Sequence, residues 1–270
     1  MTMGTSMNIV WLYLFSGAVA GIISGMLGVG GGIVLVPILI FIFGVLAIPV
    51  GMAAHMAIGT SLSTIIFTSM SAIYAQHRRK AIDWNLTRKL APATIFGSLI
   101  SGYLAGQIPG LALKAIFGVF LAAAAVQMFF EWLPAPHRTL PSPLALLGIG
   151  TGIGALSAML GIGGGTLTVP FFNWCNVDLR RAIATSTTLG FGLAIFGTIG
   201  FIVSGFQQPG LPSASFGYVS LPAMLGIAST AVLFAPLGVH VSYRLPVRRL
   251  KRIFSLLLLC LAFNILLTFI

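Results

Sequence analysis

The chain has 270 residues, of which 58% are hydrophobic and only 6% are charged, with 14 Lys and Arg against 3 Asp and Glu. A soluble domain carries about 25% charged residues, so this composition excludes a soluble enzyme and a disordered chain. Apolar runs of about 20 residues recur, and lipid accepts only helices or closed barrels. Segments such as 35–43 and 256–261 lack the alternation of a barrel strand. We therefore expect an all-α polytopic membrane protein, with the lipid bilayer as its main partner.

The net charge of +11 is gathered in short clusters between the apolar runs. Five basic residues fall within 78–89, five within 244–252, and Arg138, Arg180 and Arg181 lie near the middle of the chain. Only Lys114 stands alone. Short basic clusters between apolar segments are typical of cytoplasmic loops, so we expect no nucleic-acid binding.

The apolar segments follow the same order in two halves of the chain. In the first half they are 8–27, 33–48, 51–75, 90–106 and 113–132; in the second they are 144–160, 165–176, 182–205, 217–239 and 253–270. This order predicts a first membrane repeat over 1–133, a Pro-rich linker over 134–143 and a second repeat over 144–270.

The second segment of each half is too short to cross a bilayer. Residues 165–176 reach about 18 Å as a helix, against a hydrocarbon core of about 30 Å. We therefore expect the first two segments of each half to form a hairpin with a glycine-rich tip, followed by three transmembrane helices. Whether the hairpins re-enter or span fully stays open.

An internal duplication supports these two repeats. Residues 24–37 read SGMLGVGGGIVLVP and residues 157–170 read SAMLGIGGGTLTVP, at a constant offset of 133. A second match, at offset 125, pairs 57–62 (AIGTSL) with 182–187 (AIATST). Repeats of this kind are found in many secondary transporters.

The charges of equivalent loops predict that the two repeats have inverted topology. The loop at 78–89 is basic whereas its equivalent at 206–216 has no charge, and the uncharged loop at 107–110 corresponds to the basic loop at 244–252. A hairpin followed by three spans crosses the membrane an odd number of times, which also requires inversion. Under the positive-inside rule, all basic residues except Lys114 are cytoplasmic and both termini lie outside the cytoplasm.

The glycine-rich tips are the main candidate site. Glycine lets successive backbone N–H groups converge, and a helix that starts there directs its positive end at the same point. Two tips entering from opposite faces would offer uncharged donors to a small anion near the midplane. The candidate residues are Gly28, Gly30, Gly31 and Gly32 in the first tip and Gly161, Gly163, Gly164 and Gly165 in the second. A purely structural turn is the alternative.

Other residues are candidates for the same site or for helix packing. Hydroxyls of Thr60, Ser61, Thr185 and Ser186 could complete an anion site, or could bond back to their own helix. Asn173 could be a donor to the anion or form a bond between helices. For the glycines spaced by four, we expect close helix packing; these are Gly17, Gly21, Gly25, Gly150 and Gly154, with Ala158 in the next position of the second series.

The remaining polar residues indicate neither an enzyme nor a cofactor. Cys175 and Cys260 show no metal or disulfide spacing. A hydrolase built from Ser61 and His55 lacks a recognisable motif, and we expect His55 at the membrane interface instead. Asp83 and Asp178 neighbour basic residues and are expected to form ion pairs in loops. With Glu131 they are the only carboxylates, so no proton-carrying carboxylate is expected within the membrane.

On the doubled glycine motif with its downstream Pro37 and Pro170, the chain resembles the TauE/SafE-type sulfite exporter family, the group that includes toluene-sulfonate uptake permeases. The resemblance covers nearly the whole chain. It implies a multi-pass protein of the cell inner membrane that moves sulfite, sulfonates or related organic anions. We therefore expect a secondary transporter of a small sulfur-containing oxyanion, with a passive anion channel as the alternative. Homodimerisation stays open.

Overall fold

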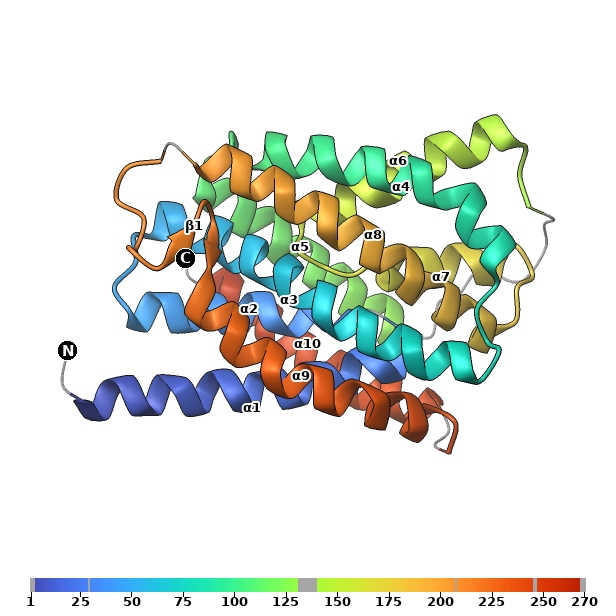
Figure 1. Cartoon of the computed structure of the whole chain (residues 1–270), viewed down its shortest axis with the longest axis horizontal. Coiled ribbons are helices and arrows are strands. Elements are labelled where there is room, and N and C mark those ends of the chain that lie inside the picture. The colour runs from blue at the N-terminus through green and yellow to red at the C-terminus, as the bar shows by residue number, and fades with distance from the viewer. Residues whose placement is uncertain (1–2, 29, 131–139, 207, 245–246, 268–270) are drawn as a thin grey trace.

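The computed structural model describes residues 3–28, 30–130, 140–206, 208–244 and 247–267, with only the backbone described at 3–7 and 247–254. These residues form ten helices and one short antiparallel pair of strands (Figure 1). The helices are α1 Met3–Leu27, α2 Gly32–Val45, α3 Val50–Arg78, α4 Trp84–Ala105, α5 Gly110–Phe129, α6 Pro143–Met159, α7 Gly165–Trp174, α8 Leu179–Gly205, α9 Leu221–Ser242 and α10 Val247–Leu267. The strands are β1 Ser215–Phe216 and β2 Val219–Ser220. The predicted all-α architecture is confirmed apart from these strands. Most of the predicted linker over 134–143, together with Glu131 and Arg138, lies outside the described residues.

Two aspartates set helix starts rather than forming the expected ion pairs. Asp83 accepts the Leu86 N–H at 3.0 Å, so α4 begins six residues before the apolar run at 90–106. Asp178 accepts the N–H groups of Arg180 and Arg181 at 3.0 and 3.3 Å and starts α8. A carboxylate in this position satisfies N–H groups that the helix leaves without partners, which stabilises the helix by about 1 kcal/mol.

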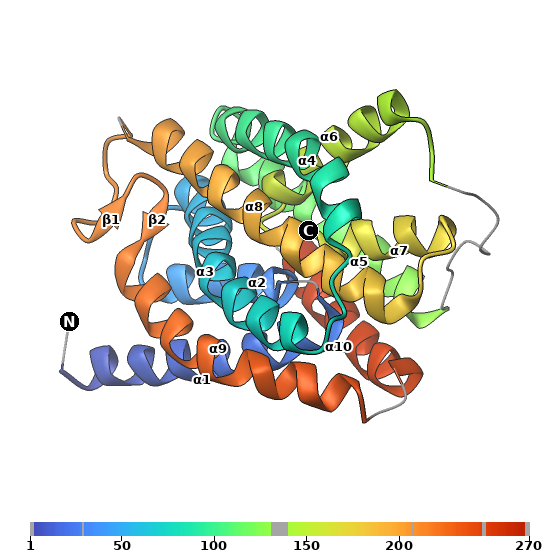
Figure 2. The ribbon, with the colours of Figure 1, turned by 45° about the vertical axis from the view of Figure 1, so that its right-hand side comes forward.

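The helices run largely along the long axis of the molecule and alternate in direction (Figures 1 and 2). The connections at 79–83 and 175–178 and the end of α9 lie together at one end, on the right of Figure 1. This is called the basic end here, because Arg78, Arg79, Lys80, Arg180 and Arg181 lie there. The opposite end holds the connections at 46–49, 106–109 and 208–214, which have no charged residue, and is called the uncharged end. The start of α1 and the end of α10 also lie at the uncharged end (Figure 1).

Glycines spaced by four residues let two pairs of helices approach closely. Gly17, Gly21 and Gly25 of α1 lie against backbone atoms of α9, and a Cβ at Gly21 would be 2.6 Å from the carbonyl oxygen of Ala231. In the same way, α6 packs along α4 through Gly154, which lies against the backbone of Thr94. The packing role predicted for these glycines is confirmed.

The β1–β2 pair places an aromatic residue over the start of α3. Tyr218 is 3% exposed and stacks on His55 with ring centroids 4.7 Å apart; burial raises the pKa of the Tyr218 phenol above its ordinary value. His55 is itself buried, and its ring nitrogens contact the carbonyl oxygens of Gly51 and Ile108 at 2.9 and 3.0 Å. His55 is therefore enclosed by the β1–β2 turn and by the connection that precedes α5, and its place at the membrane interface stays a prediction.

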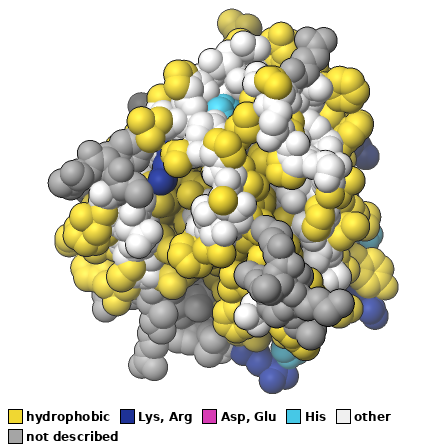
Figure 3. Space-filling model, turned by 90° about the vertical axis from the view of Figure 1, so that its left-hand side faces the viewer, with side chains coloured by type: hydrophobic (Ala, Val, Ile, Leu, Met, Phe, Trp, Pro, Cys, Tyr) yellow, Lys and Arg dark blue, Asp and Glu magenta, His cyan; other side chains and the backbone are white. Residues whose placement is uncertain are grey.

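The outer surface is apolar. Five helices of the described chain, α1, α3, α5, α8 and α9, are long and apolar enough to cross a membrane. Large side chains such as Trp11, Phe15, Phe41, Leu144 and Leu233 are exposed on the outer faces of the helices. Figure 3 views the uncharged end, where most of the described atoms are hydrophobic or uncharged. The fold is that of a polytopic helical membrane protein. Among the five candidate spans α3 is the most enclosed, since 72% of its most apolar stretch is buried inside the molecule.

Candidate functional site at the glycine turns

Each predicted glycine tip forms a tight turn between two helices. In the first turn, between α1 and α2, Gly28, Gly30 and Gly31 have φ angles of +68°, +76° and +72°. Side chains disfavour this left-handed region, so the turn requires glycine. In the second turn, between α6 and α7, Gly161 has a φ of +66°, whereas Gly164 has helical angles of −54° and −20°. The two turns therefore share a sequence but differ in backbone shape.

The two turns meet in the interior of the molecule. A Cβ at Gly30 would lie 2.9 Å from the Cα of Gly163, which is 133 positions further along the chain. Gly32, the first residue of α2, lies directly against the carbonyl oxygen of Gly161. These approaches leave no room for side chains, so backbone groups of the two turns face each other directly.

Helices α3 and α8 enclose the turns from two sides. Ser61 of α3 donates a hydrogen bond from Oγ to the carbonyl oxygen of Gly161 at 2.8 Å. From α8, the carbonyl oxygen of Ile183 lies 2.8 Å from the position of a Cβ at Gly28, and Gly190 faces the backbone nitrogen of Gly164. Because Ser61 lies eleven residues from the start of α3, the turns are about 17 Å along that helix, well inside the molecule.

The electrostatic character of this centre comes from the backbone. Helices α2 and α7 both begin at the turns, at Gly32 and Gly165, and their first N–H groups lack partners within the helix. The positive end of each helix dipole is therefore directed at the centre. The side chains in contact with the turns, including Ala20, Ile58 and Thr187, carry no charge. Such a centre can bind a small anion through uncharged donors.

The hydroxyls of Thr60 and Thr185 take part in contacts between the two halves. Thr60 accepts the backbone N–H of Ser220 at 2.9 Å, and Thr185 accepts that of Asp83 at 3.1 Å. Ser220 and Asp83 are the residues immediately before α9 and α4. These contacts differ from both predicted roles, which were completing an anion site and bonding back to the same helix. Each threonine instead joins the long helix of one half to a helix start in the other.

Ser186 differs from its sequence counterpart Ser61. It is fully buried, and its Oγ has no hydrogen-bond partner. Two serines that the sequence reasoning did not single out, Ser24 and Ser157, share this property. Both belong to the duplicated motif, and their carbonyl oxygens accept the N–H groups of Gly28 and Ile162 in the turns. Because a buried hydroxyl without a partner costs about 1–3 kcal/mol, these side chains are candidates for contact with a ligand.

Other candidates are not brought to the turns. Asn173 is half-buried in the last turn of α7, about 12 Å along the helix from Gly165. Ser61 and His55 each contact backbone carbonyl oxygens, so they do not form the pair of nucleophile and base that a hydrolase needs. Across the described residues, no group of three His, Cys, Asp or Glu side chains is arranged to hold a metal ion.

Comparison with known proteins identifies the family. The family model for the sulfite exporter TauE/SafE matches residues 13–265. A probable membrane transporter protein of Haemophilus influenzae is 35% identical over 257 residues, covering 94% of this chain and 97% of the relative. One from Methanocaldococcus jannaschii is 29% identical over 252 residues, covering 92% and 91%. No solved structure gives a significant match. The chain therefore belongs to the sulfite exporter TauE/SafE family, a family of membrane transporters.

Proposed function

We propose that the protein is a secondary transporter of a small sulfur-containing oxyanion and that the two glycine turns form its substrate site. The observation that carries this proposal is the direct approach of the turns at Gly30 and Gly163, deep between α3 and α8. Two helix N-termini converge there without a charged side chain, a recurring way for membrane transporters to hold anionic groups. A lysine or arginine at the same depth would cost several kcal/mol.

The two halves are proposed to be inverted-topology repeats around this site. Several paired contacts support the proposal: α1 packs along α9 as α6 packs along α4, and the Thr60–Ser220 contact has a counterpart in Thr185–Asp83. The opposite directions of α3 and α8 in Figure 1 are also those of inverted repeats. In such transporters, one repeat rocks against the other around a fixed central site.

The basic end is proposed to face the cytoplasm of a bacterial or archaeal cell, with the protein in the inner membrane. This proposal rests on the concentration of arginines at that end and on the uncharged connections at the other. Both termini would then lie outside the cytoplasm, because α1 begins and α10 ends at the uncharged end.

The substrate class is proposed from the family description and from the chemistry of the turns. The matching model is that of a sulfite exporter. Each helix terminus contributes up to about 2 kcal/mol in a partly buried site, which favours a weakly hydrated, singly charged anion such as bisulfite or a sulfonate. No ATP-binding motif occurs in the sequence, so ion or substrate gradients would supply the energy.

A passive anion channel is the second candidate, and uptake kinetics separate the two. The close contact between Gly30 and Gly163 favours a carrier, since it closes the centre of the molecule in this conformation. Purified protein in proteoliposomes should accumulate labelled sulfite or methanesulfonate above equilibrium, with saturation, when an ion gradient is imposed. A flux that rises linearly with concentration and only dissipates gradients would favour the channel. A rate equal to that of protein-free liposomes would contradict both.

A further inference from the structure

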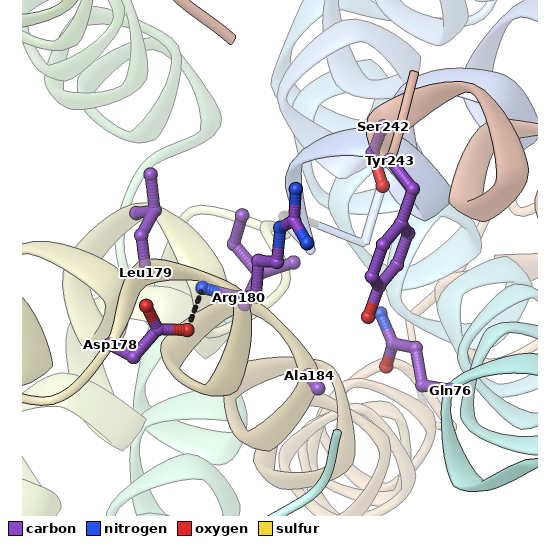
Figure 4. Close-up of a pocket in the computed structure, with 8 residues that line it drawn as sticks. Gln76, Asp178, Leu179, Arg180, Ala184, Ser242 and Tyr243 are labelled. Atoms are coloured by element: carbon purple, nitrogen blue, oxygen red, sulfur yellow. Dashed lines mark hydrogen bonds between the residues drawn. The ribbon is translucent and has the colours of Figure 1, made fainter. Parts of the chain in front are cut away.

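A pocket of about 190 Å³ opens at the basic end, between the end of α3, the start of α8 and the end of α9 (Figure 4). Gln76, Arg180, Ile183 and Tyr243 are among the residues that line it. Figure 4 shows the Arg180 guanidinium beside the Tyr243 ring, with the tyrosine hydroxyl directed toward the side where Gln76 lies. The pocket lies outside the glycine turns and has no role in the site described so far.

Two guanidinium groups share the ring of Tyr243. Arg180 lines this pocket, whereas Arg79 lines a neighbouring one, where its Nη2 lies 3.1 Å from His240 Nδ1. The Cζ atoms of Arg79 and Arg180 lie 4.3 and 4.9 Å from the centroid of the Tyr243 ring. Cation–π attraction holds each arginine there, although the two positive charges come within about 9 Å of each other and repel. Such a pair attracts an anion, and planar guanidinium groups suit the paired oxygens of a sulfonate or sulfite.

The wall of the pocket also carries one carboxylate, that of Asp178. Its Oδ2 accepts the two N–H groups at the start of α8, so its charge is partly compensated by the helix dipole. With Arg180 on the same wall and Arg79 over the same ring, the mouth keeps an excess of positive charge.

Residues of the pocket wall connect it to the first glycine turn. Gln76 is 2% exposed, its Nε2 donates to Thr187 Oγ1 at 3.4 Å, and its Oε1 has no partner. Thr187 Oγ1 in turn lies 3.2 Å from the position of a Cβ at Gly28, and Ile183 contacts the same glycine. A chain of polar groups thus connects the mouth of the pocket to the turn, through a residue whose amide is buried but incompletely bonded.

We propose that this pocket is the mouth through which the anion reaches the glycine turns from the basic end. Arg180 collects a sulfonate-like or sulfite-like oxyanion, helped by the positive charge of Arg79 beside the same Tyr243 ring, and Gln76 with Thr187 line its way to Gly28. Tyr243 is a positioning residue that holds the two guanidinium groups at the mouth. This inference rests on the proposed function. Its test does not measure transport; it measures whether the pocket favours anionic over cationic reagents.

The test uses a cysteine at Ser242, which lines the pocket, in a Cys175→Ser, Cys260→Ser background. Purified Ser242→Cys protein is reacted with a negatively charged sulfonatoethyl methanethiosulfonate and with its trimethylammonium analogue, and both rates are divided by those of a free thiol. We expect this normalised ratio of anionic to cationic rates to be about ten. Arg180→Gln and Arg79→Gln should each lower it about fivefold, the effect of one nearby charge in partly screened surroundings.

Arg181→Gln is the matched control, because it removes the same charge from an adjacent exposed residue that neither lines the pocket nor is one of the two arginines on the Tyr243 ring. It should leave the ratio within about twofold of its starting value, since a charge outside the pocket acts on the pocket through solvent, which screens it. Tyr243→Phe should keep the ratio and Tyr243→Leu should lower it, because the aromatic ring attracts both guanidinium groups by a cation–π interaction that leucine cannot make. A normalised ratio near one before any arginine is changed, or equal losses in Arg180→Gln and Arg181→Gln, would overturn the proposal. Absent uptake by the unmodified protein would instead count against the proposed function.

Discussion

The Oγ of Ser61 donates a hydrogen bond to the carbonyl oxygen of Gly161, 2.8 Å away in space and 100 positions away in the chain. This bond joins the most enclosed span, α3, to the glycine turn of the other half. It also helps to hold Gly161, whose backbone is left-handed and which packs against Ile58 and Val36 of the first half. The neighbouring residue Thr60 binds the start of α9 through Ser220, so two successive hydroxyls of α3 fix two elements of the second half.

The equivalent residue of α8, Ser186, makes no hydrogen bond through its hydroxyl. Ser186 is buried without a partner, although Ile183 and Thr187 of the same helix touch the first turn at Gly28. One half of the site is therefore held by a structural hydrogen bond, while the other keeps a free polar group. This difference leads to the first prediction.

Ser61→Ala and Ser186→Ala should have opposite effects. Ser61→Ala removes the bond to Gly161 and should lower stability by about 1 kcal/mol, seen as a lower unfolding temperature in detergent. Ser186→Ala removes no bond and relieves the cost of a buried hydroxyl without a partner, so stability should rise, while the KM for substrate increases about tenfold through loss of a substrate contact. Ser69→Ala is the control, because Ser69 is also buried without a partner but lies eight residues beyond Ser61, about 12 Å along α3. An unchanged KM in Ser186→Ala would remove this residue from the site.

Gly164→Ala should impair transport without unfolding the protein. The helical backbone of Gly164 accepts alanine, and the nearest atom to the new Cβ would be Thr168 Oγ1 at 3.1 Å. That buried hydroxyl, which donates to the Gly164 carbonyl oxygen, need move by only a few tenths of an ångström. The methyl group would cover backbone donors of the turn, so uptake should fall at least about tenfold. Gly31 is a poorer test, because its φ of +72° and the Ala20 carbonyl oxygen 2.7 Å from its Cβ position would strain any side chain.

Gly152→Ala serves as the matched control for that experiment. Gly152 lies in α6 with no atom near its Cβ position, so alanine there should leave uptake unchanged and raise stability by up to about 1 kcal/mol. Normal uptake by Gly164→Ala, at normal expression, would assign that glycine to packing alone.

Cysteine labelling should place the two ends of the molecule on opposite sides of the membrane. In a background without Cys175 and Cys260, Ser213→Cys and Asn85→Cys should react with impermeant maleimides from opposite sides of intact cells and inverted vesicles. Both residues are exposed, whereas the nearby Thr87 is only 8% exposed and unsuitable. If both cysteines were labelled from the same side, the proposed inversion of the repeats would be wrong.

Amide substitutions should leave the pH dependence of transport intact. Asp83 and Asp178 act as helix caps, a role that asparagine also fills, so Asp83→Asn and Asp178→Asn should keep both transport and its pH profile. The alanine variants should lose about 1 kcal/mol of stability. Glu131→Gln is expected to behave like the two asparagine variants. A pH profile that flattens in any amide variant that still transports would reveal a side-chain proton carrier.

Several features followed from the sequence because they depend on local physics. Composition and segment length determined a helical membrane protein, since lipid leaves backbone polar groups no other partners. The short apolar run at 165–176 predicted a returning helix, and the observed α7 ends at Trp174. Glycines at a spacing of four predicted close packing, because that spacing places them on one helix face.

Other features needed the tertiary structure, because they depend on pairs of groups that the sequence keeps far apart. Nothing local distinguishes Ser61 from Ser186, yet one is bonded to Gly161 and the other has no partner. The burial of His55 depends on Tyr218, which lies 163 positions away. The stacking of Arg79 and Arg180 on Tyr243 likewise brings together the ends of three helices. Sequence periodicity specifies which face of a helix is apolar or small; which atoms meet across two faces is decided only when the helices pack.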